Sequence, residues 1–544
     1  MTIQCYHCHV KYNSLVNIED TIGVNKNSIK DNSINITIII LFILPKLNSK
    51  EIFLNVIMTR AEDQDEVVYK PTTESELFQK LKPQNEKKKD TCLFLYFTSI
   101  VVNLLPLTTG MAVTWTSPVS LKLLSSDPII NPLGKPVTTL QLSFIGSFPS
   151  LGAISGLMLL GSCFDIYGRK KIMIALSSLL AVSYIILAFS TNIYFYYASM
   201  VAIGLALGVG TAGTTLYCSE ITEDHNRSKF ICFIGLSLPL GNLLAFVLGP
   251  FFSVKVFSLM CSIPSFIYFF CFSIILPESP VYLLSKGDVE NAKKALTELR
   301  NKSLKEIEKE IEMIQFTLMQ NMKSEEKGLV YLVKNRASRK AFIIAAVMFS
   351  FSLTGAPSII AFLDLIFQEA GTNISGFVST ITVALVQVIG CIVASMIVEK
   401  FGRRQLMLTS SILCGIPMFA ISLFFKMKSY IPSITESLGW LPVLSLVIFF
   451  IFFVIGLGNV PMVFVSEVFP NNVKSLATSI VISTNFIVIG LTLFLFPVIM
   501  ANFGLAWNFF GIGGMCILNF VFIYCAMPET RGKSILEIQD ILNV

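Results

Sequence analysis

The chain has 544 residues, of which 53% are hydrophobic and 14% are charged, and its mean hydropathy is +0.71. This composition excludes an ordinary soluble domain and indicates a protein with many membrane-spanning segments. The net charge of +6 is spread over many short polar breaks, so we relate it to membrane orientation rather than to a nucleic-acid partner. The twelve cysteines are scattered, and we interpret them as small core residues rather than a disulfide framework.

Residues 1–91 are predicted to be a polar cytoplasmic tail. Their longest apolar run, 38–44, is too short to cross a bilayer. The run Cys5-Tyr-His-Cys8-His9 matches a haem-attachment pattern or half of a zinc site, but no second ligand pair follows. We therefore expect neither a metal nor a cofactor. A more ordinary tail begins at Met58, and we hypothesise that translation starts there and that 1–57 extend the gene model.

Apolar segments of about 20 residues, the length needed to span a hydrocarbon core as a helix, recur from Cys92 to Met527. The predicted spans are 92–117, 139–162, 171–190, 194–218, 230–252, 256–277, 341–367, 374–398, 405–425, 440–466, 475–499 and 503–527.

These spans predict an all-α membrane protein of twelve transmembrane helices in two six-helix bundles, at 92–277 and 341–527. The polar stretch 278–340 carries an apolar helical stripe and is expected to form linker helices, and 528–544 form a tail. Lys and Arg gather in the loops after spans 2, 4, 8 and 10 and in both tails, which places the termini and the linker in the cytoplasm. We expect the chain in the plasma membrane.

Charged motifs indicate that the second half duplicates the first. The loop Asp165-x-x-Gly168-Arg169 returns as Glu399-x-x-Gly402-Arg403. Two further pairs keep the same order along the chain: Glu220 to Arg227 matches Glu467 to Lys474, and Pro277-Glu278-Ser279 matches Pro528-Glu529-Thr530.

The motifs resemble those of the sugar-porter branch of the major facilitator superfamily, and most of all the insect facilitated trehalose and hexose transporters. The resemblance covers about 90–544. Its motifs occur, in order, at 110–118, 165–170, 217–227, 277–284, 399–404, 456–470 and 528–533. It implies two bundles around a central cavity, a substrate near the membrane midplane and alternating access by rocking.

An acid and an arginine at the ends of neighbouring helices can form an ion pair that a small tilt breaks. We predict such a gating latch, with glycines that permit tight turns; the alternative is that the basic residues only anchor the loops. The latch candidates are Asp165, Gly168, Arg169, Glu220, Arg227, Glu278, Glu399, Gly402, Arg403, Glu467, Lys474 and Glu529. Lys474 replaces the usual arginine of the family, which is expected to weaken the second latch.

Most sugar contacts implied by the resemblance are replaced in this chain. Phe351-Ser-Leu-Thr-Gly-Ala-Pro357 stands where the family has Gln-Gln-x-Ser-Gly-x-Asn, and Gly235 stands for a glutamine. Sugar binding needs hydrogen-bonding side chains and an aromatic face. The remaining candidates are Trp115, Gln141, Asn242, Ser352, Thr354, Gln387, Asn459 and Asn485. For each of them, a hydrogen bond between helices is an equally good explanation.

No Asp, Glu or His lies deep in a predicted span, and Asp364 falls near the outer end of span 7, where a water-exposed mouth is as well supported as a site. Passive transport is therefore favoured over proton coupling. We predict a facilitative carrier of a hexose or trehalose in the lipid bilayer, with no enzyme activity. A carrier of another small solute and a non-transporting membrane sensor stay open as alternatives, and the sequence predicts no oligomeric state.

Overall fold

The computed structural model describes residues 93–543, apart from 162, 301–303, 324–333, 354, 372–374, 399, 432, 434–436, 470 and 534. The side chains of 224–229, 231–232, 351–353 and 471–475 also lie outside the description, as do those of a few residues at other helix ends. The amino-terminal tail and the hypothesis of a start at Met58 fall outside the described residues.

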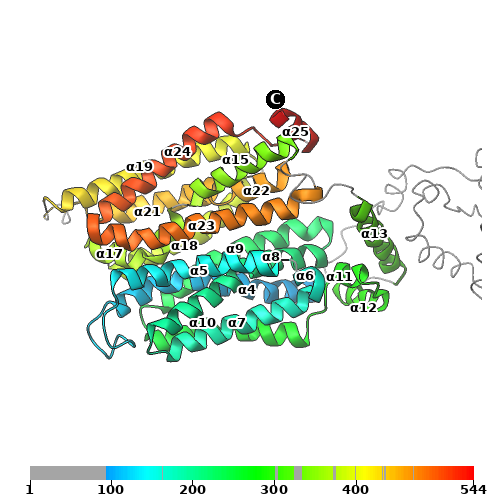
Figure 1. Cartoon of the computed structure of the whole chain (residues 1–544), viewed down its shortest axis with the longest axis horizontal. Helices are drawn as coiled ribbons and strands as arrows, with labels where there is room; N and C mark the ends of the chain where they lie inside the picture. The colour runs from blue at the N-terminus through cyan, green and yellow to red at the C-terminus, as the bar shows by residue number, and fades with distance from the viewer. Residues whose placement is uncertain are drawn as a thin grey trace, which may run out of the picture. The chain divides into compact units, whose positions relative to one another are not determined.

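Six long helices form the amino-terminal bundle (Figure 1). They are α4 (Leu93–Leu123), α5 (Thr139–Leu160), α7 (Arg169–Phe189), α8 (Ile193–Ile221), α9 (Asp224–Leu248) and α10 (Val254–Ile274), with the short α6 (Cys163–Tyr167) between α5 and α7. Glycines let α5 and α8 approach closely: a Cβ on Gly152 would lie 2.0 Å from the carbonyl oxygen of Val201, and one on Gly204 would lie 1.9 Å from that of Pro149. Small residues at such contacts are typical of helices that pack within a membrane.

The carboxy-terminal bundle contains two broken spans. Its helices are α15 (Arg336–Leu353), α16 (Ala356–Ala361), α17 (Leu363–Ala370), α18 (Gly376–Ile397), α19 (Arg403–Lys428), α21 (Leu441–Phe452), η3 (Phe453–Leu457), α22 (Val460–Val468), α23 (Asn471–Phe503) and α24 (Leu505–Ala526). The seventh span is divided into α15, α16 and α17, and the tenth passes through the π-helical turn η3. Broken helices of this kind occur in membrane proteins where the backbone is buried in protein or lines a cavity.

The twelve-span, all-α arrangement is confirmed. Ten helices of the described chain are long and apolar enough to cross a membrane. The fifth span contributes a shorter apolar stretch, Phe233–Leu248, and the seventh is the divided one. The described residues form helices, turns and bends and include no strand.

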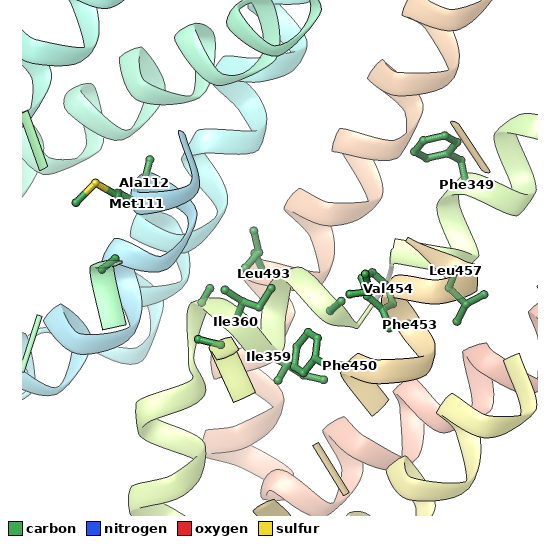
Figure 2. Close-up of a cluster of buried hydrophobic side chains, with 14 of the residues drawn as sticks. Met111, Ala112, Phe349, Ile359, Ile360, Phe450, Phe453, Val454, Leu457 and Leu493 are labelled. Atoms are coloured by element: carbon green, nitrogen blue, oxygen red, sulfur yellow. The ribbon is translucent and has the colours of Figure 1, made fainter. Parts of the chain in front are cut away.

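Apolar side chains surround both breaks (Figure 2). Figure 2 shows Phe450 at the end of α21, Val454 within η3 and Ile359 of α16, which are all buried and belong to one apolar cluster. The bundles meet where α5 packs against α23 and where α9 packs against α18.

The linker forms α11 (Pro280–Ser285), α12 (Val289–Arg300) and α13 (Leu304–Lys323). These three helices share a small apolar core that includes Leu284, Leu296 and Ile307. Arg300 attaches the linker to the amino-terminal bundle, because its buried guanidinium donates to the carbonyl of Ile221 at the end of α8. It also donates, at 3.0 Å, to Glu310 within the linker. Figure 1 shows α11 to α13 and α25 (Ile535–Asn543) at one end of the bundles, which we call the linker end, and α17 at the opposite end.

Candidate functional site

At the linker end of the amino-terminal bundle, Arg169 forms a two-pronged ion pair with Glu220. Arg169 is the first residue of α7, and Glu220 lies in the last turn of α8. Nε lies 3.0 Å from Oε2 and Nη2 lies 2.8 Å from Oε1, with side chains only 8% and 9% exposed. Asp165 also lies 3.2 Å from Arg169, but its side chain is 77% exposed, so it contributes little. A buried pair of this kind is stable only when its remaining polar atoms are satisfied.

Neighbouring groups satisfy this ion pair. Glu278 accepts hydrogen bonds from the backbone N–H groups of Arg169 and Lys170, each at 3.0 Å. Its charge therefore lies at the amino-terminal end of α7, where the helix dipole favours an anion. The hydroxyl of Ser279 donates to Oε2 of Glu220. The network thus joins the ends of three segments of one bundle.

The carboxy-terminal bundle has a matching but looser network. Nε and Nη2 of Arg403 donate to the same oxygen of Glu467, at 3.3 and 3.1 Å, and these side chains are 13% and 26% exposed. Glu529 accepts from the backbone N–H groups of Arg403 and Arg404 at 2.9 and 3.2 Å. The hydroxyl of Thr530 donates to Glu467 at 2.6 Å. Greater exposure and the use of a single carboxylate oxygen make this the weaker of the two pairs.

The glycines of the two loops make room for carboxylates. Gly168 has φ 97° and ψ 160°, a conformation that is nearly restricted to glycine, and a Cβ there would lie 2.4 Å from Oε2 of Glu278. Gly402 has an ordinary φ of −66°, so the expected special turn is absent there. A Cβ on Gly402 would nevertheless lie 2.4 Å from Oε2 of Glu529, so close approach alone calls for glycine at this position.

Every contact named above stays within one half of the chain, and none of them crosses from the amino-terminal half to the carboxy-terminal half. The structure therefore brings together the predicted pairs Arg169–Glu220 and Arg403–Glu467, while their gating role stays a prediction. Glu399 and the side chains of Arg227 and Lys474 lie outside the described part of the chain.

Ser279 and Thr530 were missed as partners of the two acids. Each follows directly after a predicted latch acid in a Pro-Glu-hydroxyl motif. The repetition of a hydroxyl at this point in both halves is the signal that could have found them.

A second polar group joins the two bundles within the membrane region. Asn242 of α9 accepts from the hydroxyl of Thr114 at 3.0 Å and donates to Oε1 of Gln387 of α18 at 3.3 Å. Both amides are buried, and Nε2 of Gln387 has no hydrogen-bond partner. Oδ1 of Asn485, a buried candidate on α23, has none either.

The other substrate candidates have structural partners. Trp115 is fully buried, its ring N–H donates to Ser258 of α10 at 3.0 Å, and its ring lies 6.1 Å from that of Tyr196. Gln141 forms a capping box at the start of α5. Asn459 donates at 2.7 Å to the carbonyl of Val454, beside the π-helical turn.

The remaining candidates on span 7 cannot be placed in the same way. Thr354 and the side chain of Ser352 lie outside the described residues. Asp364 is 8% exposed, so it does not stand at a water-exposed mouth. No group of three His, Cys, Asp or Glu residues in the described ranges is arranged to hold a metal ion.

Comparisons with known proteins agree with this architecture. The sequence model of the family "Sugar (and other) transporter" matches residues 37–542. The facilitated trehalose transporter Tret1 of Apis mellifera ligustica is 27% identical over 405 residues, which are 74% of this chain and 80% of the relative. The probable metabolite transport protein CsbC of Bacillus subtilis is 28% identical over 417 residues, which are 75% of this chain and 87% of that protein.

Among solved structures, the inward-open xylose transporter XylE from E. coli has the same fold. The TM-score is 0.68 at 20% sequence identity, and the match covers 82% of this chain and 99% of XylE. The family match over most of the chain, the twelve spans and the shared fold lead to one conclusion. The chain belongs to the sugar (and other) transporter family and is a multi-pass membrane transporter rather than an enzyme.

Proposed function

We propose that the chain carries a sugar, a hexose or trehalose, down its concentration gradient by alternating access. The amide bridge between Asn242 and Gln387 carries the proposal, because it lies between the two bundles that must move against each other. A buried donor without a partner costs about 1–3 kcal/mol. A sugar hydroxyl that accepts from Nε2 of Gln387 would remove this cost, since each hydroxyl can both donate and accept.

Space for a solute is available at Gly235, where the resemblance implies a glutamine. A Cβ added there meets no atom within 4 Å, and the residue is exposed. The thiol of Cys391, on α18, donates to the carbonyl of Gly235 at 3.6 Å, so the open position lies at the same α9–α18 contact as the amide bridge. A missing side chain about two helical turns from the amide bridge, on the same α9–α18 contact, supports a sugar site with altered contacts.

We also propose that the linker end faces the cytoplasm and that the chain lies in the plasma membrane. The orientation is supported by the Lys and Arg residues in the loops at that end. In this orientation the Arg169 and Arg403 networks lie on the cytoplasmic side. We propose that they act as the gating latch, with the helix ends of each half held more tightly when the cytoplasmic side is closed than when it is open.

The test is uptake by purified protein in lipid vesicles, with labelled glucose, fructose, trehalose and a panel of polyols. Saturable flux of a sugar is the expected result. Saturable flux of a polyol alone would identify a carrier of another solute. Thermal stabilisation by a ligand without any flux would identify a sensor, and either of these results overturns the sugar-carrier proposal.

A matched pair of variants tests the site itself. Gln387→Ala removes the Nε2 donor that has no partner, together with the oxygen that accepts from Asn242, and we expect about a fivefold rise in KM, the effect of one net hydrogen bond to the solute. Gln141→Ala makes the same chemical change in a helix cap and should leave KM unchanged. Equal KM values for the two variants would place the sugar elsewhere.

A further inference from the structure

Asp364 lies buried at the end of the bundles opposite the linker. The seventh span breaks at Phe362, whose φ and ψ are −124° and 20°, and α17 begins at the next residue. Asp364 is therefore in the first turn of α17, at the end of the bundles that Figure 1 shows away from α11 to α13. Its side chain is a carboxylic acid, yet it is almost completely removed from solvent. Such a group needs strong partners in the protein.

These partners come from both bundles. The hydroxyl of Ser117, on α4 of the amino-terminal bundle, donates to Oδ2 of Asp364 at 3.0 Å. The backbone N–H of Asp364 donates back to Oγ of Ser117 at 2.9 Å. The hydroxyl of Thr380, on α18 of the carboxy-terminal bundle, lies 2.9 Å from Oδ1 and 2.8 Å from the carbonyl oxygen of Gly376, so its one proton is shared between these two acceptors. Both carboxylate oxygens thus have donors, and the reciprocal pair with Ser117 crosses from one bundle to the other.

The positive charge of Lys122 makes a smaller contribution than the two hydroxyls to this arrangement. Lys122 lies at the end of α4, and its ammonium is fixed by the carbonyls of Gly249 and Phe252. It attracts the carboxylate of Asp364 electrostatically. The amino-terminal bundle therefore supplies both a hydroxyl donor and a positive charge to an acid of the other bundle.

Aromatic contacts between the bundles lie at the same end. The rings of Phe251 and Phe377 lie 5.0 Å apart at 78°, and those of Phe144 and Phe494 lie 5.4 Å apart. The ring of Phe362 approaches to 3.0 Å of the place where Gly146 would carry a Cβ. Aromatic side chains thus join the two bundles at the same end as the polar contact.

We propose that Asp364 is the polar clasp of the outer gate. It holds the outer ends of the bundles together through Ser117 while the outer entrance is closed. When the bundles part at this end, the link to Ser117 breaks and outside water solvates the carboxylate, whereas the bond to Thr380 stays within its own bundle. The clasp deepens the proposed function and rests on its alternating access and orientation. Asp364 is a positioning residue that does not touch the sugar.

The experiment compares two hydroxyls that donate to the same carboxylate. Ser117→Ala removes the bond between the bundles, and Thr380→Val removes the bond within one bundle. The reporter is Leu493→Cys, because Leu493 is 7% exposed and its carbonyl oxygen lies 3.8 Å from the Cβ position of Gly146 in the other bundle. Whole cells are treated with a membrane-impermeant maleimide, and labelling of the same chain without the reporter is subtracted.

Ser117→Ala is expected to raise outside labelling of the reporter about fivefold, the equilibrium shift that corresponds to one net hydrogen bond. Thr380→Val is expected to leave the labelling unchanged. Unchanged labelling in Ser117→Ala, or an equal increase in Thr380→Val, would overturn the clasp. Asp364→Asn keeps the size of the side chain but not its charge, and it should also increase labelling.

The labelling needs no substrate, so the test of the clasp is independent of the test of sugar transport. A chain that shows the Ser117 effect but carries no sugar would keep the clasp and refute sugar transport. Sugar flux without any effect of Ser117→Ala on labelling would refute the clasp and keep sugar transport.

Discussion

The guanidinium of Arg169 uses two nitrogens to contact both oxygens of Glu220, whereas Arg403 in the second bundle directs two nitrogens to one oxygen of Glu467. The two halves of the chain thus repeat the same ion pair with unequal geometry. Since the Arg169–Glu220 pair is more deeply buried, its removal should lower the free energy of unfolding more than removal of the Arg403–Glu467 pair.

The first prediction concerns the ion pairs of Arg169 and Arg403, which differ in burial and geometry. Arg169→Ala leaves the buried Glu220 without its partner and should cost about 3–5 kcal/mol of stability. As a gating latch the network is proposed to be tighter in the outward-facing state, so its loss is also expected to shift the resting population toward the inward-facing state. Thermal unfolding measures the first effect, and labelling of outside-facing cysteines measures the second.

Two controls accompany this prediction. Lys171→Ala removes an exposed charge from the same helix and should change neither measurement. Arg403→Ala should give a smaller loss of stability than Arg169→Ala. A larger loss with Arg403→Ala would show that the second network is the stronger one.

The second prediction separates backbone strain from crowding at Gly168. Gly504 is a matched control, because it also precedes a helix, has φ 87° and ψ 164°, and has no atom within 4 Å of an added Cβ. Gly504→Ala should cost about 1–3 kcal/mol from backbone strain alone. Gly168→Ala should cost more, because its methyl group also displaces the carboxylate of Glu278. Equal melting temperatures for the two variants would show that the contact with Glu278 has no effect on stability.

Hydropathy and motif spacing predicted the spans and the ion pairs, but not the directions of side chains inside the membrane. Repeated charges at helix ends have few possible partners, so Arg169 and Glu220 could be matched from sequence. The spans are apolar on all sides, and their sequence does not show which face meets another helix. Trp115 was therefore placed toward the cavity although it lies in the core, and Gln141 was not recognised as a helix cap. The burial of Asp364 depends on Ser117, which is distant in the sequence.

The third prediction follows from the position of Trp115. Trp115→Phe removes the hydrogen bond to Ser258 and some buried apolar volume, while it keeps an aromatic ring. We expect a loss of about 1–3 kcal/mol in stability, because Ser258 loses its buried partner. The KM for sugar should remain within about twofold, since the ring is fully buried against Ser258 and Tyr196. A large rise in KM with unchanged thermal stability would instead make Trp115 part of the binding site.

The fourth prediction restores the side chain that the resemblance implies at Gly235. Gly235→Gln should fold, because an added Cβ meets no atom there, and its amide would extend from α9 near the bridge between Asn242 and Gln387. A new donor and acceptor at this place should change the ratio of kcat/KM for glucose and trehalose, since the larger sugar loses space while the smaller one gains a hydrogen bond. Gly511→Gln adds the same side chain at another open position, on α24, and should leave that ratio unaltered. If both variants keep the glucose-to-trehalose ratio of kcat/KM found for the unchanged chain, the α9–α18 contact is not the place where sugars are distinguished.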